Sequence, residues 1–131
     1  MIEYRETKDV DLAELSRLRA DAGFDHRSDA TLRQQVEGAY WVLSAWEGAR
    51  LVGFVRAISD GVDHAYVSTM MVDSAYRRRG IGRELIRRLT TGRDSVRFTL
   101  HSRDGAIAFY RALGFSDITQ MMRLDRRSTA G

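Results

Sequence analysis

Residues 67–83 have the sequence VSTMMVDSAYRRRGIGR, which carries more information about the fold than any other part of the chain. The first six of these residues are apolar or carry small hydroxyl groups, as expected of a strand. A short polar loop follows, and Gly80 and Gly82 then open a segment with apolar residues at helical spacing. This order is typical of an anion site, because the first turn of a helix has unpaired N–H groups and the positive end of the helix dipole.

Three phosphate-binding motifs can be compared with this stretch. A P-loop has the pattern G-x-x-x-x-G-K-[ST], which is excluded because the stretch contains no lysine. A dinucleotide fingerprint has G-x-G-x-x-G directly after the strand, but Leu85 occupies the place of the third glycine here, and seven residues separate Val72 from Gly80. The third pattern, R-x-x-G-x-G, matches from Arg77 to Gly82 without exception.

Length and composition favour one folded domain. The chain has 131 residues, of which 44% are hydrophobic and 30% charged, so we expect a single domain over residues 1–131. The absence of cysteine excludes a disulfide scaffold, a thiolate nucleophile and a zinc site that uses sulfur. The longest nearly apolar run, residues 39–46, is far shorter than the ~18 residues of a membrane span, and charged residues near the start argue against a signal peptide. We therefore expect a cytoplasmic protein without a membrane partner.

The rest of the sequence alternates between predicted strands and helices. The strands are expected at residues 2–6, 40–46, 51–58, 65–72, 95–101 and 118–124. The helices are expected at residues 9–22, 29–38, 80–90 and 106–113, with Ser28 or Asp29 capping the second of them. This order indicates an α/β protein, with an α+β or mixed sheet and helices on both faces.

A second informative stretch lies downstream, where residues 106–115 have the sequence AIAFYRALGF. It matches the pattern A-x-x-F-Y-x-x-x-G-F, and together with R-x-x-G-x-G it resembles the GNAT superfamily of acyl-CoA-dependent N-acyltransferases. The specific motifs cover residues 67–115, and the element order of the remaining chain is compatible. The resemblance implies a mostly antiparallel sheet of six to seven strands with about four helices on its two faces. It also implies a cofactor-binding core at about residues 65–115.

The resemblance further implies where acetyl-CoA binds. In this family the glycine loop wraps the pyrophosphate of coenzyme A, and the preceding strand pairs its backbone with the pantetheine arm. Transferred by position, the arm lies along Met70, Met71 and Val72. The pyrophosphate lies on the backbone N–H groups of residues 78–83. The residues of the loop that are implied to bind the cofactor are Arg77, Arg78, Arg79, Gly80, Ile81, Gly82 and Arg83.

Two positions depart from the family pattern. Ser74 occupies the place of a frequent proline, and Arg103 stands where an asparagine often contacts the cofactor arm. Ser102 and Asp104 are the neighbouring residues that could replace this contact, and Asp104 is included among the residues expected to bind the cofactor. Tyr110 is included as well, because the resemblance implies that its hydroxyl faces the sulfur.

Tyr110 is also the candidate general acid, since the family often uses the tyrosine of this segment to protonate the departing thiolate. The alternative is an ordinary core aromatic, because Tyr110 shares an apolar helix face with Ala106 and Leu113. Both can hold for one residue, with its ring packed in the core and its hydroxyl toward the cofactor. Because the chain has no cysteine, direct attack by the amine in a ternary complex is favoured over an acyl-enzyme on a thiol.

The general base stays open at this level. Some family members have a glutamate at the position of Tyr66, whose phenol is no comparable base at neutral pH. His64, expected on the same strand face, and His101, at the end of the next strand, are tentative bases. Each is explained equally well as a polar residue at a strand end, and a water chain to solvent is a third route. The histidines lack metal-ligand spacing, so no metal is expected.

Three functions can be compared on these grounds. The leading hypothesis is an N-acetyltransferase that transfers the acetyl group of acetyl-CoA to a primary amine of a small molecule or peptide. The open question of the base leaves a non-catalytic acyl-CoA sensor of the same fold as the alternative. A nucleic-acid-binding module is disfavoured, because it rests only on the arginines of residues 77–88 and no recognition motif accompanies them. Many relatives pair, so a homodimer stays open.

Overall fold

The sheet follows the chain in strand order. Within residues 1–126, the part that the computed structural model describes, it has five strands in the order β1-β2-β3-β4-β5. These strands are β1 (Glu3–Glu6), β2 (Trp41–Glu47), β3 (Arg50–Ser59), β4 (His64–Val72) and β5 (Arg97–Leu100). β1 to β4 pair antiparallel, and β5 pairs parallel with β4. All of these strands belong to one unit, residues 1–100, and residues 101–131 form a second unit that is described by itself.

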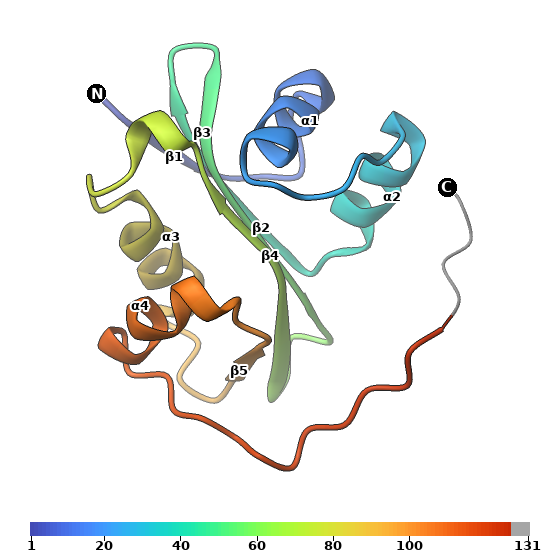
Figure 1. The fold of residues 1–131 in the computed structure, drawn as a ribbon, viewed down its shortest axis with the longest axis vertical. Coiled ribbons are helices and arrows are strands. Elements are labelled where there is room, and N and C mark those ends of the chain that lie inside the picture. The colour runs from blue at the N-terminus through green and yellow to red at the C-terminus, as the bar shows by residue number, and fades with distance from the viewer. Residues whose placement is uncertain (127–131) are drawn as a thin grey trace. The chain divides into compact units, whose positions relative to one another are not determined.

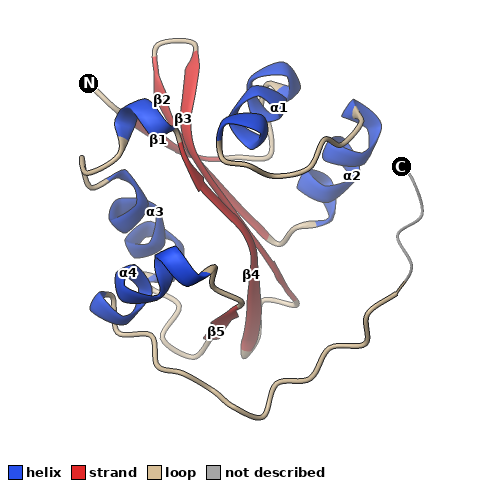
Figure 2. Ribbon diagram, viewed as in Figure 1, coloured by secondary structure: helices blue, strands red, loops and turns tan. Residues whose placement is uncertain are grey.

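Helices cover both faces of this sheet, as expected from the element order. The α-helices are α1 (Leu12–Asp21), α2 (Asp29–Gly38), α3 (Ile81–Thr90) and, in the second unit, α4 (Ile107–Ala112); two short 3-10 turns are η1 (Ser74–Tyr76) and η2 (Asp104–Ala106). In the first unit, α1 and α2 lie on one face of the sheet and α3 lies on the other (Figure 1). Figure 2 separates these helices from the strands by colour.

Side-chain caps and buried apolar residues explain where α1 and α2 form. The side chain of Asp11 accepts a hydrogen bond from the Glu14 N–H, and that of Ser28 accepts one from the Thr31 N–H. The predicted cap at Ser28 is therefore confirmed. The core on this face of the sheet joins residues of both helices with residues of β2, β3 and β4. Its members are Val10, Leu15, Leu18, Leu32, Val36, Ala39, Val42, Trp46, Leu51, Phe54 and Met71.

Gly53 allows α3 to pack closely against the sheet. A Cβ at Gly53 would lie 2.8 Å from Ile81 Cγ2 and 2.9 Å from Leu85 Cδ1, and both of these side chains are buried. We expect Gly53→Ala to lower the free energy of unfolding by about 1–3 kcal/mol, because overpacking displaces the helix. Urea denaturation followed by circular dichroism measures this effect.

Gly38→Ala is the matched control, because no heavy atom lies within 4 Å of a Cβ placed on Gly38. It also exchanges glycine for the better helix former at the last residue of α2. This control should therefore unfold at the same urea concentration as the wild type or at a higher one. If Gly53→Ala had the same midpoint as the control, the close approach of α3 to Gly53 would be contradicted.

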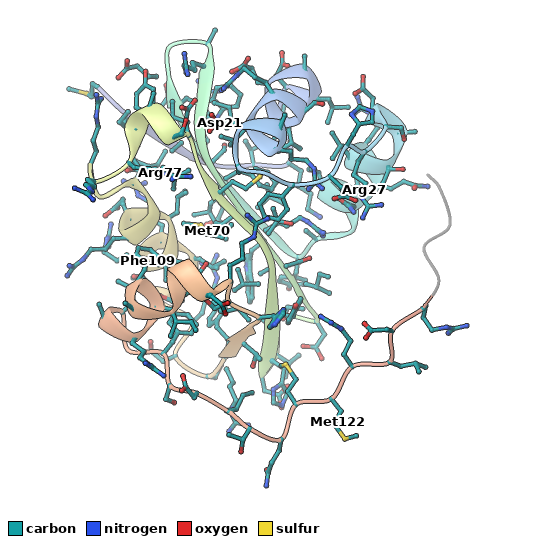
Figure 3. All side chains as sticks on the ribbon, in the orientation of Figure 1. Asp21, Arg27, Met70, Arg77, Phe109 and Met122 are labelled. Carbon is teal, nitrogen blue, oxygen red and sulfur yellow. The ribbon has the colours of Figure 1, made fainter. Side chains whose placement is uncertain are left out.

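The predicted C-terminal strand is wrong. Residues 118–124 have neither helix nor strand. A strand forms only where its backbone is hydrogen-bonded to a neighbour, so alternating side chains are insufficient here. The apolar side chains of the segment are exposed, from 48% for Met121 to 94% for Met122, which is labelled in Figure 3. The described sheet thus has five strands instead of six to seven.

The remaining predicted elements are confirmed, and their ends differ from the predicted ones by at most three residues. The helix predicted from residue 9 begins at Leu12, because Asp11 caps it. Gly114, the expected stop of the last helix, has a positive φ of 97° just after Leu113, the C-terminal cap of α4. No helix among residues 1–126 combines the length and the apolar character that a membrane crossing requires.

Candidate functional site

β4 loses one of its two neighbouring strands halfway along its length. β5 pairs with β4 only from His64 to Val67, whereas β3 pairs with it as far as Val72. Within residues 1–100, residues 68–72 therefore have no strand on the β5 side. The segment contains Met70, which Figure 3 labels on β4. A strand edge without a partner can hydrogen bond to an extended ligand, which is the arrangement expected for the pantetheine arm.

A β-bulge marks the point where this free edge begins. Arg56 lies opposite Thr69, but the next residue of β3, Ala57, lies opposite Val67, so Ser68 is an extra residue in β4. Arg56 binds both hydroxyls, since its Nε donates to Thr69 Oγ1 at 3.1 Å and its Nη2 donates to Ser68 Oγ at 3.0 Å. Sequence reasoning did not include this arginine among the site residues. The sequence feature that could have indicated Arg56 is its position as the single charged residue within the apolar β3 segment LVGFVRAI.

The glycine loop after β4 leads into α3 through two left-handed residues. Arg78 has a φ of 64° and Gly80 a φ of 79°. Gly80 is the N-terminal cap of α3 and provides no side-chain hydrogen bond to the first turn. No heavy atom lies within 4 Å of a Cβ placed on Gly80, so the backbone is open on that side. The turn therefore presents N–H groups to an anion, in the part of the loop predicted to hold the pyrophosphate.

The arginines around this turn divide into two groups. Arg87 and Arg88 pair with Glu84, at 2.9 Å from Arg87 Nε to Oε1 and 2.6 Å from Arg88 Nε to Oε2. Hydrogen bonds from Arg87 and then Arg88 lower the pKa of Glu84 to about 2. Glu84 therefore stays ionised, and its carboxylate is held by Arg87 and Arg88, on the C-terminal side of the turn. The arginines that form no ion pair with any residue among 1–126 are Arg77, Arg78, Arg79 and Arg83.

An ion-pair network around the buried carboxylate of Asp73 fixes the start of the glycine loop. Asp73 Oδ2 accepts hydrogen bonds from Arg17 Nη1 at 3.1 Å and Arg50 Nη2 at 2.9 Å, and Oδ1 accepts one from the Ala75 N–H at 2.9 Å. The Asp73 side chain is only 1% exposed. Burial opposes its charge, but the bonds from Ala75, Arg50 and Arg17 together hold the pKa of Asp73 below its usual value. Residues from α1, β3 and the loop are thus joined.

Asp21 anchors the next residue of the loop to the end of α1. Its Oδ2 accepts the Ser74 N–H at 2.8 Å, and its Oδ1 accepts the Ser74 hydroxyl at 2.7 Å. Figure 3 shows Asp21 close to the turn that precedes Arg77. Proline has neither donor, so Ser74 gives this chain an anchor that the family's frequent proline cannot form.

The Asp73 network leads to a test of stability against pH. We expect Asp73→Asn to lower the free energy of unfolding at pH 7 by about 2 kcal/mol, because Arg17 and Arg50 lose a charged acceptor. Because the folded pKa lies below the unfolded value of 3.8, the contribution of Asp73 is present above pH 3.8 and is lost as pH falls through the lower, folded pKa. Urea denaturation of wild type and variant at pH 7, 5 and 3 measures both effects.

The exposed Asp94 provides the control, because Asp94→Asn makes the same exchange at the surface. The wild type and this control should lose more stability between pH 5 and pH 3 than Asp73→Asn does. Equal acid sensitivity of all three proteins would contradict the role of Asp73 as the ionised centre of the network.

Tyr110 and Asp104 belong to the unit of residues 101–131. Tyr110 lies on α4, where its ring contacts Phe109 and Phe115 with centroid distances of 5.0 and 5.5 Å. Burial raises the pKa of the Tyr110 phenol, so the hydroxyl carries its proton at neutral pH, as a general acid requires. Asp104 begins the 3-10 turn η2. The catalytic role of Tyr110 and the cofactor contact of Asp104 stay predictions.

The two tentative bases are exposed side chains. His64 Nε2 lies 3.8 Å from Asp63 Oδ2, which is beyond hydrogen-bonding distance. His101 directly follows β5 and is also exposed. Tyr66, which occupies the position of the family's glutamate, is 39% exposed. Among residues 1–126 there is no group of three or more side chains placed to hold a metal ion.

Comparison with known proteins identifies a family whose model matches most of this chain. Residues 8–125 match the model of the acetyltransferase (GNAT) domain. Serotonin N-acetyltransferase 2, chloroplastic, of Oryza sativa subsp. japonica is 29% identical over 119 residues, which cover 86% of this chain and 60% of that protein. Histone acetyltransferase TAP1 of Glycine max is 31% identical over 121 residues, 82% of this chain and 52% of that protein. This chain therefore spans only about half to three-fifths of the length of these relatives.

The similarity extends to solved structures. A GNAT family acetyltransferase from Streptococcus pneumoniae superposes with a TM-score of 0.79 at 24% identity. The superposition covers 97% of this chain and 100% of that one. At this level of identity the likeness concerns the fold, and it agrees with the mixed sheet and helices described above.

Proposed function

The chain belongs to the GNAT acetyltransferase family, and from this premise we propose that it transfers the acetyl group of acetyl-CoA to a primary amine. The observation that carries the proposal is the free edge of β4 at residues 68–72, which leads through an anchored loop into the open turn at Gly80. The strand edge suits the amides of the pantetheine arm, and the turn suits its phosphates. The four arginines without an ion pair among residues 1–126 supply positive charge around that turn.

Each step of acetyl transfer would use a different group of the chain. Acetyl-CoA supplies the thioester that the amine attacks. A backbone N–H near Met71 would donate to the thioester oxygen and stabilise the negative charge that develops there. Tyr110 would give its phenolic proton to the departing thiolate. The proton of the attacking amine would go to His64, to His101 or to solvent through water.

The amine is a small molecule or a peptide in this proposal. The names of two relatives specify serotonin and a histone, so an acceptor panel includes serotonin and a histone peptide beside amino acids and polyamines. The cytoplasmic location and the homodimer stay predictions. Two plant relatives are named as chloroplastic proteins, which gives the location no support.

Two measurements test the proposal together. Calorimetry measures the binding of acetyl-CoA, and the release of free CoA thiol measures turnover with each amine. Binding with turnover of at least one amine is the expected result. Binding without any turnover would favour the acyl-CoA sensor of the same fold, and a folded protein that does not bind acetyl-CoA would overturn the assignment.

A further inference from the structure

Three arginines gather on the face of the sheet covered by α1 and α2. Arg19 comes from α1, Arg27 from the loop before α2, and Arg56 from β3 beside the bulge of β4. Arg19 and Arg27 share the carboxylate of Asp25, with N–O distances of 3.0 Å each. Arg19 is only 6% exposed, and its guanidinium lies 5.2 Å from the centre of the Phe24 ring. Arg19, Arg27 and Arg56 together form the arginine cluster.

The arginine cluster carries more positive charge than its ion pairs with Asp25 balance. Asp25 pairs with Arg19 and Arg27 but not with Arg56, so the three guanidinium groups carry two positive charges more than this carboxylate balances. The Nε atoms of Arg19 and Arg27 are buried and have no hydrogen-bond partner among residues 1–126. Buried donors without an acceptor destabilise a folded protein, which suggests that an acceptor is supplied from outside.

Arg56 is the member of the cluster closest to the expected reaction site. Its only hydrogen-bond acceptors among residues 1–126 are the hydroxyls of Ser68 and Thr69, and it forms no ion pair there. Its Nη1 donates to no acceptor within the same residues. Burial lowers the pKa of Arg56, and repulsion by the charge of Arg19 contributes in the same direction. An anion bound at Arg56 would remove this repulsion.

The surface next to Arg56 is apolar. Ile58 lies two residues further along β3 and therefore on the same face, and it pairs with Tyr66 of β4. Ile58 is 48% exposed and Tyr66 is 39% exposed. A cation thus lies beside two accessible apolar side chains, near the start of the free edge of β4. This combination suits a ligand with one anionic group and an apolar part.

We propose that Arg56, supported by Arg19, binds a carboxylate of the acceptor, so that the preferred acceptor is a small amine bearing a carboxylate and an apolar side chain. The inference rests on the proposed function, because it specifies the substrate class of the same reaction. An apolar amino acid or a short peptide with a free C-terminus has this chemistry. Guanidinium groups bind carboxylates well, since both of their parallel N–H donors can be used.

The first experiment compares an acid with its amide. Phenylalanine and phenylalaninamide are used as acceptors, and kcat/KM is measured by the release of CoA thiol. The wild type should prefer the acid at least tenfold after correction for the fraction of neutral amine. Arg56→Gln should reduce kcat/KM for the acid about tenfold and leave the amide nearly unchanged, whereas Arg56→Lys should restore part of the preference. Arg33→Gln, at an exposed position of α2, is the matched control and should behave as the wild type.

A second experiment is independent of turnover. N-acetylphenylalanine and its amide are titrated calorimetrically into the wild type and Arg56→Gln in the presence of CoA. Tighter binding of the acid to the wild type alone supports the inference, and equal binding of both compounds to the wild type overturns it. The affinity for acetyl-CoA should be the same in the wild type and in Arg56→Gln. If the wild type acetylates amines but does not prefer acids to amides, the carboxylate site is rejected and the proposed function stands. If Arg56→Gln does not fold, the comparison within the wild type still decides.

Discussion

Tyr110→Phe should lower kcat for acetyl transfer by about 10²–10⁴-fold and leave the affinity for acetyl-CoA nearly unchanged. The substitution keeps the ring that contacts Phe109 and Phe115, and it removes only the hydroxyl. If that hydroxyl protonates the departing thiolate, the reaction loses its proton donor while the local packing is kept. Steady-state CoA release and calorimetric titration with acetyl-CoA separate the two parameters.

The pH dependence of kcat provides a second readout. Because burial raises the pKa of Tyr110 above 10.0, the donor stays protonated at neutral pH, and the wild-type rate should fall only as pH rises through that raised pKa. This basic limb should be absent from Tyr110→Phe. Tyr40→Phe, at a position 49% exposed, is the control and should keep both rate and limb. A kcat within a few-fold of the wild type, together with a lower melting temperature, would assign Tyr110 to packing and the proton to solvent.

The glycine loop was predictable because its signals are local. The strand before it, the polar loop and the helix after Gly80 each depend on residues within a few positions of one another. The left-handed φ of Gly80 is a conformation that glycine adopts without strain, so the glycine itself indicated the turn. The cap at Ser28 was predictable for the same reason, since it contacts Thr31, three residues away.

The contacts that anchor this loop could not be predicted in the same way. Asp73 is 56 residues from Arg17 and 23 from Arg50, and Ser74 is 53 residues from Asp21. No local pattern joins such residues, because only the pairing of β3 with β4 and the packing of α1 bring them together. The bulge at Ser68 was missed as well, since it arises from the register between two strands and not from the sequence of either.

The predicted strand at residues 118–124 shows the opposite error. Its residues have the composition of a strand, yet none of them is in a strand. The general base stays a prediction for a related reason: a histidine can be located by sequence, but its pKa and orientation depend on neighbours from other elements. His64 and His101 are both exposed, so neither is distinguished from an ordinary polar residue at a strand end.

Gly82→Asp should weaken the binding of acetyl-CoA at least tenfold, or by about 1.4 kcal/mol. Gly82 is the second residue of α3 and is buried in its first turn, beside the N–H groups proposed to hold the pyrophosphate. Aspartate adds a side chain and a negative charge at the place where the phosphate charge would lie. The repulsion between the two charges is screened by ions, so the loss of affinity should be smaller at high salt.

Two further variants separate charge from bulk and from stability in this test. Gly82→Ala adds only a methyl group and should lose less affinity than Gly82→Asp. Gly38→Asp introduces the same charge at the last residue of α2, where a Cβ meets no heavy atom within 4 Å, and it should bind acetyl-CoA as the wild type does. Circular dichroism and urea denaturation verify that each variant is folded before calorimetry. A carboxylate at residue 82 would compete with the pyrophosphate for the N–H groups of the turn and would therefore lower the affinity for acetyl-CoA. A folded Gly82→Asp protein with unchanged affinity would thus show that the phosphates bind elsewhere.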